Sequence, residues 1–350
     1  MMKKRMQKIL SAGLCLALVF SLAGCNVKGG SGTKKEAKDT AGKTDETTDD
    51  AKSTAFPERD ITMIIPTNSG GGSDVIARYL ATAVGEELGV TVVPQNIGGA
   101  ATATATQQLV DAEPDGYTIC MSLSSLSTMK SNGYADITYK DMKQISAVNF
   151  DSNCIFIRPD DERFSNIDEF VEYAKAHPGE LNCGTGSAGG VAHLAIVDFC
   201  DKAGIELNIV PDTSGGGFDL KLINGDVDCI VCGPIDIASS VASEDVKTIV
   251  TMTEDRLADF PDVPTATEKG WDSVTRMVRG YHAPADTPDD VIAVLEAAFK
   301  KVVESEEYEK FLADQFSNAY FLDSKAWSEQ CEEELQYFPK VMEKAGVTVS

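Results

Sequence analysis

The sequence is short of cationic side chains and of histidine. Its 350 residues contain 31 Lys and Arg against 55 Asp and Glu, which gives a formal net charge of −24. So acidic a chain argues against a nucleic-acid partner and against a polybasic membrane surface. There are only three histidines, His177, His193 and His282, so a catalytic triad has few possible bases.

Several chemical signatures are also missing. No cysteine spacing matches a zinc framework, and we expect neither a metal nor a cofactor. The serine-hydrolase pattern GxSxG is absent because Thr185 stands two residues before Ser187. Cys229 and Cys232 form a CxxC, but VDCIVCG is typical of a buried strand, on which residues three apart point to opposite faces. A redox pair is therefore a weaker interpretation than two small buried hydrophobic residues.

The first 24 residues are typical of an export signal. Four basic residues near the start precede an apolar run from Ile9 to Leu22, which is too short for a spanning helix. The run ends in Leu22-Ala23-Gly24-Cys25, which resembles a lipobox, the motif cut before a cysteine that is then lipidated. We expect Cys25 to carry the lipid anchor; the alternative is a plain secretory signal with an incidental cysteine.

Residues 25–54 indicate a flexible linker behind the anchor. After Cys25 the segment has one aliphatic residue beyond alanine and no aromatic residue, with equal numbers of lysines and acids. It cannot bury enough apolar surface to offset its chain entropy. We expect it to hold the folded part away from the membrane.

The remaining part predicts an α/β fold of two lobes. Short apolar strands, of which Asp60 to Pro66 is the first, alternate with helical patterns, as in parallel or mixed sheets flanked by helices. We predict a first lobe from residues 55–151 and 252–350, with a second lobe, residues 152–251, inserted into it. The ligand cleft would lie between the lobes, and the crossings near Asn153 and Thr251 would form a hinge.

Two glycine-rich loops stand between a strand and a helix, one in each predicted lobe. They are Pro66 to Asp74 and Gly184 to His193. Glycine lets the backbone approach a ligand closely, and a helix start presents free N–H groups that favour an anion. The pair therefore predicts two facing anion-binding loops. We expect Gly71 to present its backbone to the ligand, with no room for a side chain.

The second loop also fits GxGxxG at Gly184, Gly186 and Gly189, with Asp212 after the next strand. A dinucleotide-dependent enzyme is thus an alternative hypothesis. It is weaker because an exported protein has little access to nicotinamide cofactors.

Among single residues, Asp74 is equally suited to capping its helix and to binding ligand. His193 is expected near a helix start, where the helix dipole would lower its pKa, as a ligand donor or as a structural residue. Ser122, Ser124 and Ser125 line the cleft or form a polar turn.

A family resemblance emerges from several segments taken together. In chain order they are FPERDITMIIPTNSGGGSDVIAR, VVPQNIGGAATATATQQLVDAEPDGYTI, HPGELNCGTGSAGGVAHLA, INGDVD, FPDVPTATEKGW and HAPADTP, and the similarity as a whole runs from about Phe56 to Gly346. Each is similar to a segment of the tripartite tricarboxylate transporter receptors, also called Bug receptors, and they occur in the same order. The chain departs from that pattern at Asp212, where a tyrosine is usual, and at Asn68 and Ser69, where small apolar residues are common.

The resemblance implies a type II periplasmic-binding-protein fold and a receptor rather than an enzyme. It implies a lipid-anchored, extracytoplasmic monomer that captures a small carboxylate and delivers it to the membrane subunits of a tripartite transporter. A sensor of the same solute without transport is the alternative. The expected solute-binding residues are Asn68, Ser69, Gly70, Gly71, Gly72, Ser73, Asp74, Ser124, Thr185, Gly186, Ser187, Ala188, Gly189, His193, Thr213 and Ser214.

Overall fold

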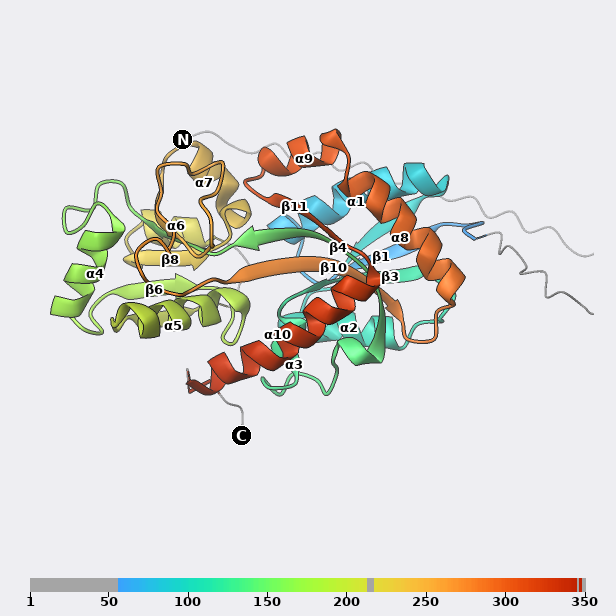
Figure 1. Ribbon diagram of the computed structural model, residues 1–350, viewed down its shortest axis with the longest axis horizontal. Coiled ribbons are helices and arrows are strands. Elements are labelled where there is room, and N and C mark those ends of the chain that lie inside the picture. The colour runs from blue at the N-terminus through green and yellow to red at the C-terminus, as the bar shows by residue number, and fades with distance from the viewer. Residues whose placement is uncertain (1–55, 213–216, 345, 348–350) are drawn as a thin grey trace, which may run out of the picture. The chain divides into compact units, whose positions relative to one another are not determined.

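The computed structural model describes residues 56–212, 217–344 and 346–347, and Ser53–Ser350 cluster as one compact unit. The predicted signal, Cys25 and the linker lie outside the described residues, as do Thr213 and Ser214. No helix in the described ranges is long and apolar enough to cross a membrane. Two sheets flanked by helices make up the described part (Figure 1).

The first sheet has the order β11-β4-β10-β3-β1-β2. Its strands are β1 (Ile61–Ile65), β2 (Val92–Asn96), β3 (Thr118–Leu123), β4 (Met142–Ser152), β10 (Arg276–Pro284) and β11 (Asn318–Leu322). β1 pairs in parallel with β2 and β3, whereas β10 is antiparallel to β3 and β4, and β11 to β4. The sheet is therefore mixed.

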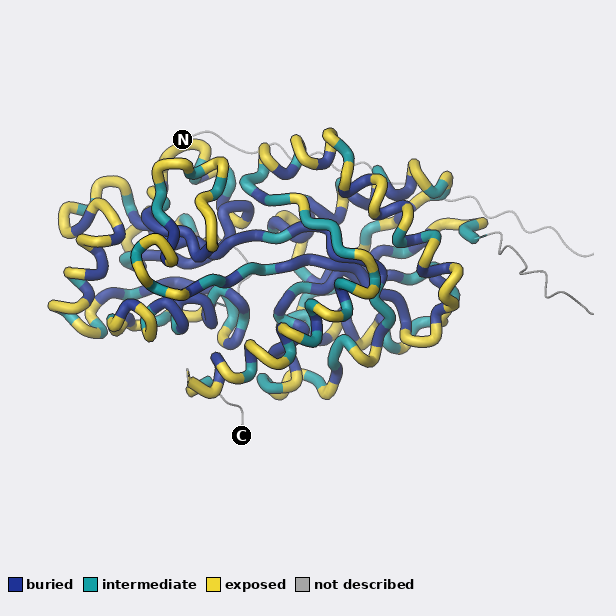
Figure 2. Tube along the Cα trace, viewed as in Figure 1, coloured by how far each residue is buried: buried dark blue, intermediate teal, exposed yellow. Residues whose placement is uncertain are grey.

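Alternation along β1 decides which helices cover each face of this sheet. Ile61, Met63 and Ile65 pack with α1 (Gly72–Leu88), α8 (Asp289–Val303) and α9 (Glu306–Ala313). Ile64 points to the other face, where it packs with α2 (Ala103–Val110) and α3 (Leu126–Met129). The burial colouring of Figure 2 shows the strands buried between these layers. Both faces are thus closed to solvent, and the strand ends are left to form a site.

The second sheet has the order β7-β6-β8-β5-β9. Its strands are β5 (Cys154–Ile157), β6 (Asn182–Thr185), β7 (Asn208–Pro211), β8 (Cys229–Cys232) and β9 (Lys247–Thr251). One face packs against α4 (Ile167–Ala176) and α5 (Val191–Ala203), and the other against α6 (Phe218–Ile223). Cys229 and Cys232 lie in these two different clusters, which confirms that they point to opposite faces.

The chain passes between the sheets at Asn153 and returns before β10. Met252 N–H donates to the Asn153 carbonyl at 2.9 Å, and Thr275 N–H donates to the Met252 carbonyl at 3.0 Å. The return comes later than the boundary predicted at residue 252, because Met252 and Ala266 are buried in the core of the second sheet. A further contact joins the sheets' helices, since Leu194 of α5 packs with Phe338 of α10 (Ser324–Lys344).

Sequence analysis missed β4, β10 and β11. The two long strands β4 and β10 contain buried polar residues, among them Asn149, Asp151, Arg279 and His282. These residues break the apolar pattern by which a buried strand is recognised. The region after Asp289 is mostly helical, apart from β11.

Candidate functional site

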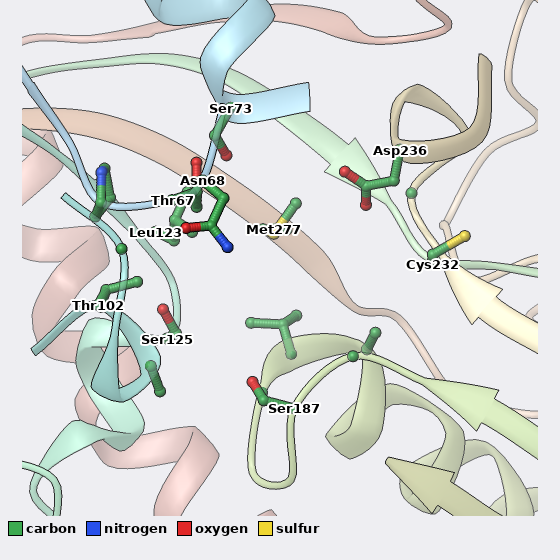
Figure 3. A pocket seen from close by; sticks show the side chains of 18 of the residues that line it. Thr67, Asn68, Ser73, Thr102, Leu123, Ser125, Ser187, Cys232, Asp236 and Met277 are labelled. Atoms are coloured by element: carbon green, nitrogen blue, oxygen red, sulfur yellow. The ribbon is translucent and has the colours of Figure 1, made fainter. Parts of the chain in front are cut away.

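A cavity of about 440 Å³ lies where the two sheets' loops meet (Figure 3). The first sheet and its loops supply Pro66, Thr67, Asn68, Ser73, Gly98, Gly99, Ala100, Ala101, Thr102, Leu123, Ser125, Tyr134 and Met277. The crossing residue Asn153 and the second sheet's loops supply Gly186, Ser187, Gly190, Val191, Ala192, Asp212, Cys232, Gly233 and Asp236. Parts of both glycine-rich loops therefore face one space, as the sequence predicted.

The first loop presents Asn68 and Ser73 to the cavity, and Asp74 holds it from behind. Asp74 accepts hydrogen bonds from Gly70 N–H and from the Asn96 amide, each at 2.9 Å, and pairs with Arg78 at 2.9 Å. Burial alone would raise the pKa of Asp74, but these bonds together lower it, so the group is ionised. Asp74 is buried and is not among the cavity-lining residues. Through these contacts Asp74 fixes the conformation of the first loop and does not itself face the cavity.

A third loop, residues 98–102, completes this wall and was not among the predicted site residues. Ala100, Ala101 and Thr102 have φ values of 45°, 48° and 79°, a run of left-handed conformations that is costly outside glycine. A Cβ on Gly98 would lie 2.4 Å from Oδ1 of Asn68, so the two loops are in close contact. The paired glycines in NIGGAAT were the signal available in the sequence.

The second loop presents Gly186 and Ser187 to the cavity, followed by Val191 and Ala192 in the first turn of α5. Gly189 has a φ of 71°, and a Cβ there would lie 2.3 Å from the Asn132 side chain, so only glycine fits. Gly189 N–H donates to Nδ1 of His193 at 2.9 Å. His193 thus fixes the turn from within its own helix.

Burial lowers the pKa of His193, so the ring is neutral and its Nδ1 accepts the bond from Gly189. The direction agrees with the sequence prediction, but the cause is desolvation. His193 is buried and is not one of the lining residues, which favours its structural role.

The serines at the end of β3 differ in position, and Ser124, which was expected to bind solute, does not line the cavity. Ser125 lines the cavity, whereas Ser124 is buried behind it. The Ser124 hydroxyl donates to Glu334 at 3.0 Å and accepts from Val278 N–H at 3.0 Å. It ties β10 to α10 and has no contact with the cavity. Ser122 is likewise buried, and its hydroxyl oxygen lies 2.5 Å from Nε2 of His282.

Gly71 also differs from the expectation. A Cβ on Gly71 would meet no atom of the described residues within 4 Å, and its φ is −87°. The position therefore has room for a side chain and does not line the cavity, whereas Asn68 and Ser73 of the same loop do. Of the predicted residues, those that line the cavity are Asn68, Ser73, Gly186 and Ser187. The others in the described part, namely Ser69, Gly70, Gly71, Gly72, Asp74, Ser124, Thr185, Ala188, Gly189 and His193, are not in contact with it.

The electrostatics of the cavity come from helix ends and two acids. The N-cap residues of α1 and α5 are Gly71 and Gly190, which have no side chain to cap their helices. The Asp236 carboxylate accepts a hydrogen bond from the N–H of Gly72, the first residue of α1. Among the described lining residues there is no Lys, Arg or His, but Asp212 and Asp236 are present. Asp212 forms an ion pair with Lys221. The described residues also contain no group of His, Cys, Asp and Glu that could hold a metal.

A buried ion pair lies behind the first loop. Arg279 of β10 pairs with Asp151 of β4, and neither side chain is exposed to solvent. Arg279 Nε donates to the Ser73 hydroxyl at 3.0 Å, so the pair also holds the start of α1. Sequence reasoning missed both residues, because each stands in a strand that lacked an apolar pattern.

The chain resembles known proteins along most of its length. The family model of tripartite tricarboxylate transporter family receptors matches residues 76–347. Protein BugT of Bordetella pertussis is 29% identical over 257 residues, which cover 71% of this chain and 78% of BugT. The solved structure of the periplasmic binding protein BugD is 25% identical, with a TM-score of 0.75 over 84% of this chain and 99% of BugD. R. palustris Rpa4515, solved with adipate, shares the fold at 20% identity, with a TM-score of 0.78 over 84% of this chain and 99% of that protein.

Proposed function

The chain belongs to the tripartite tricarboxylate transporter receptor family, and we propose that it captures a small carboxylated solute and delivers it to the membrane subunits of such a transporter. As a receptor of this family it is an extracytoplasmic solute-binding protein with a two-lobed periplasmic-binding-protein fold, and not an enzyme. The GxGxxG of the second loop accordingly belongs to a solute cleft.

The observation that carries the carboxylate proposal is that the starts of α1 and α5 meet at one cavity, and that Gly190 leaves the start of α5 without a side-chain cap. Ser73 of α1 and Val191 of α5 line this cavity, and both belong to the first turn of their helices. The first N–H groups of a helix have no partner inside the helix, and the helix dipole adds a partial positive charge there. A carboxylate can therefore be bound by backbone donors, without a cationic side chain.

The lipid anchor is a separate part of this proposal. Its support is the sequence Leu22-Ala23-Gly24-Cys25 after a basic and apolar start. Growth with a radiolabelled fatty acid should label the protein in membranes, and Cys25→Ser should abolish the label and release the protein. A Cys25→Ser protein that is labelled as before would contradict the proposal.

The solute class is tested by the melting temperature of the purified protein against small carboxylic acids, neutral sugars and inorganic cations. A ligand that binds only the folded state raises the melting temperature in a concentration-dependent way. We expect at least one carboxylic acid to do so. Stabilisation by sugars or cations alone would contradict the proposal.

A backbone substitution tests the helix start directly. Val191 is the first residue of α5, where proline is tolerated because its missing N–H has no intrahelical partner. Val191→Pro should weaken binding of the stabilising acid about tenfold to a hundredfold, since a hydrogen bond to a charged group contributes about 1.5–3 kcal/mol. Val191→Ala keeps the N–H, loses similar apolar packing and serves as the control. Equal affinity of the two variants would exclude this N–H as a ligand donor.

A further inference from the structure

Asp236 is an acid within a cleft that otherwise suits an anion. It lies in the short helix η3 (Pro234–Ile237) after β8, and its side chain is exposed to the cavity. Figure 3 shows its carboxylate pointing into the cavity, on the opposite side from Asn68 and Ser187. The other lining acid, Asp212, has an ion pair with Lys221, whereas no salt bridge to Asp236 is formed by the described residues.

The neighbourhood fixes this carboxylate in place. Ile235 and Ile237 on either side of it are buried, which anchors the helical turn. A Cβ built on Gly72 would lie 3.1 Å from Oδ1 of Asp236, and one on Gly233 would lie 3.6 Å from its Oδ2. The Asp236 carboxylate accepts hydrogen bonds from Gly72 N–H at the start of α1 and from Gly233 N–H in its own loop. A group held in this way is preorganised, so that binding a partner costs little side-chain entropy.

The cation that acts on Asp236 is Arg279, which forms no ion pair with it. Arg279 is bonded to Asp151 and to Ser73, and it acts on Asp236 only through space. The protein atoms around Asp236 displace water and raise its pKa to about 6, an effect that Arg279 opposes. At neutral pH the cleft therefore contains an anionic carboxylate that lacks a direct cationic partner in the described part of the chain.

We infer that the solute carries a protonated amine as well as its carboxylate, and that Asp236 binds this amine; the inference rests on the proposed function. An α-amino acid or a similar amino-carboxylate has both groups. The carboxylate binds at the start of α5, beside Ser187 and Val191, because Asp236 already faces the start of α1. A solute with a second carboxylate in place of the amine meets like-charge repulsion from Asp236.

The first test compares matched ligands on the unmodified protein. The twenty proteinogenic L-amino acids and their deaminated carboxylic acids are titrated by calorimetry. We expect one amino acid to bind at least tenfold more tightly than its deaminated acid. If simple acids bind and their amino forms bind no better, the inference is wrong while the proposed function stands. If no acid of either kind binds, both are wrong.

The second test uses a charge-neutral variant of the same shape. Asp236→Asn should weaken the preferred amino acid at least tenfold and leave its deaminated acid bound equally well or better. Asp226→Asn removes one negative charge at an exposed acid that does not line the cavity, and it should retain the preference for the amine. Loss of the preference in both variants would mean that net charge, and not Asp236, selects the solute. Melting temperatures without ligand show that each variant is folded.

Discussion

The buried pair of Arg279 and Asp151 gives the sharpest test of the tertiary structure. Both side chains are fully buried, and Arg279 also donates to Ser73 at the cavity. In Arg279→Met the Asp151 carboxylate stays buried with only neutral donors, the Ser317 hydroxyl at 2.5 Å and the Asn149 amide at 3.4 Å. Removing one partner of a buried ion pair costs about 3–5 kcal/mol, because the other charge is left uncompensated.

That loss should be visible as a change in melting temperature. A loss of 1 kcal/mol lowers the melting temperature of a large domain by about 2–4 °C, so Arg279→Met should melt roughly 6–20 °C lower. Urea unfolding gives the free energy directly. Asp151→Asn should also destabilise, since it leaves the arginine unpaired. The double variant contains neither charge and should be more stable than the sum of the two single losses predicts.

The double-mutant cycle decides whether charge pairing is the cause. We expect a coupling of about 2 kcal/mol or more, and little effect of added salt, because solvent ions do not reach the pair. Lys325→Met, which removes an exposed and long ion pair to Glu329, is the control and should leave the melting temperature unchanged. Single losses that simply add would refute the reasoning.

Three further predictions concern packing, pH and the second loop. Gly280→Ala places a Cβ 2.4 Å from the buried Trp327 ring, and it should lower the free energy of unfolding by about 1–3 kcal/mol; an unchanged urea midpoint would contradict this. Burial raises the pKa of Glu334 from 4.5 to about 7, so the stability that this group contributes is complete below pH 4.5 and is lost as the pH rises through 7. Glu334→Gln should remove this loss, of roughly 3 kcal/mol, and its stability relative to the unmodified protein should rise from pH 5 to pH 8. Gly189→Ala should weaken solute binding, measured by calorimetry, since the Cβ would overlap Asn132 at an unfavourable φ, and Asn132→Ala in the same protein should restore part of the affinity.

Much of the fold could be predicted from local pattern. The alternation of strands and helices holds in the structure from β1 to β9, except where β4 is followed directly by β5. Short strands such as β1 and β8 are apolar, and helices such as α4 have one apolar face. The strands β4 and β10 could not be predicted in this way. Their interior residues include Arg279 and Asp151, which are buried only because they pair with each other across the sheet.

The candidate site was likewise predictable in part from local sequence and in part only from tertiary contacts. Local sequence placed two glycine loops before helices, and Asn68 and Ser187 of those loops do face one cavity. The neighbouring Ser124 and Ser125 could not be told apart, because the register of β3 against β10 decides which of them faces inward.

The sequence by itself determined the family and the glycine loops, since these depend on motifs whose residues are close together along the chain. The export signal and the lipid anchor remain predictions from the same kind of local pattern. Only the tertiary structure decided that loop 98–102 closes the cavity wall, that His193 and Asp74 hold loops from behind, and that Asp236 lines the cavity. These roles depend on contacts between distant segments, such as Asp236 beside Gly72. Spacing along the chain does not reveal such a contact, because it forms only when both sheets are packed.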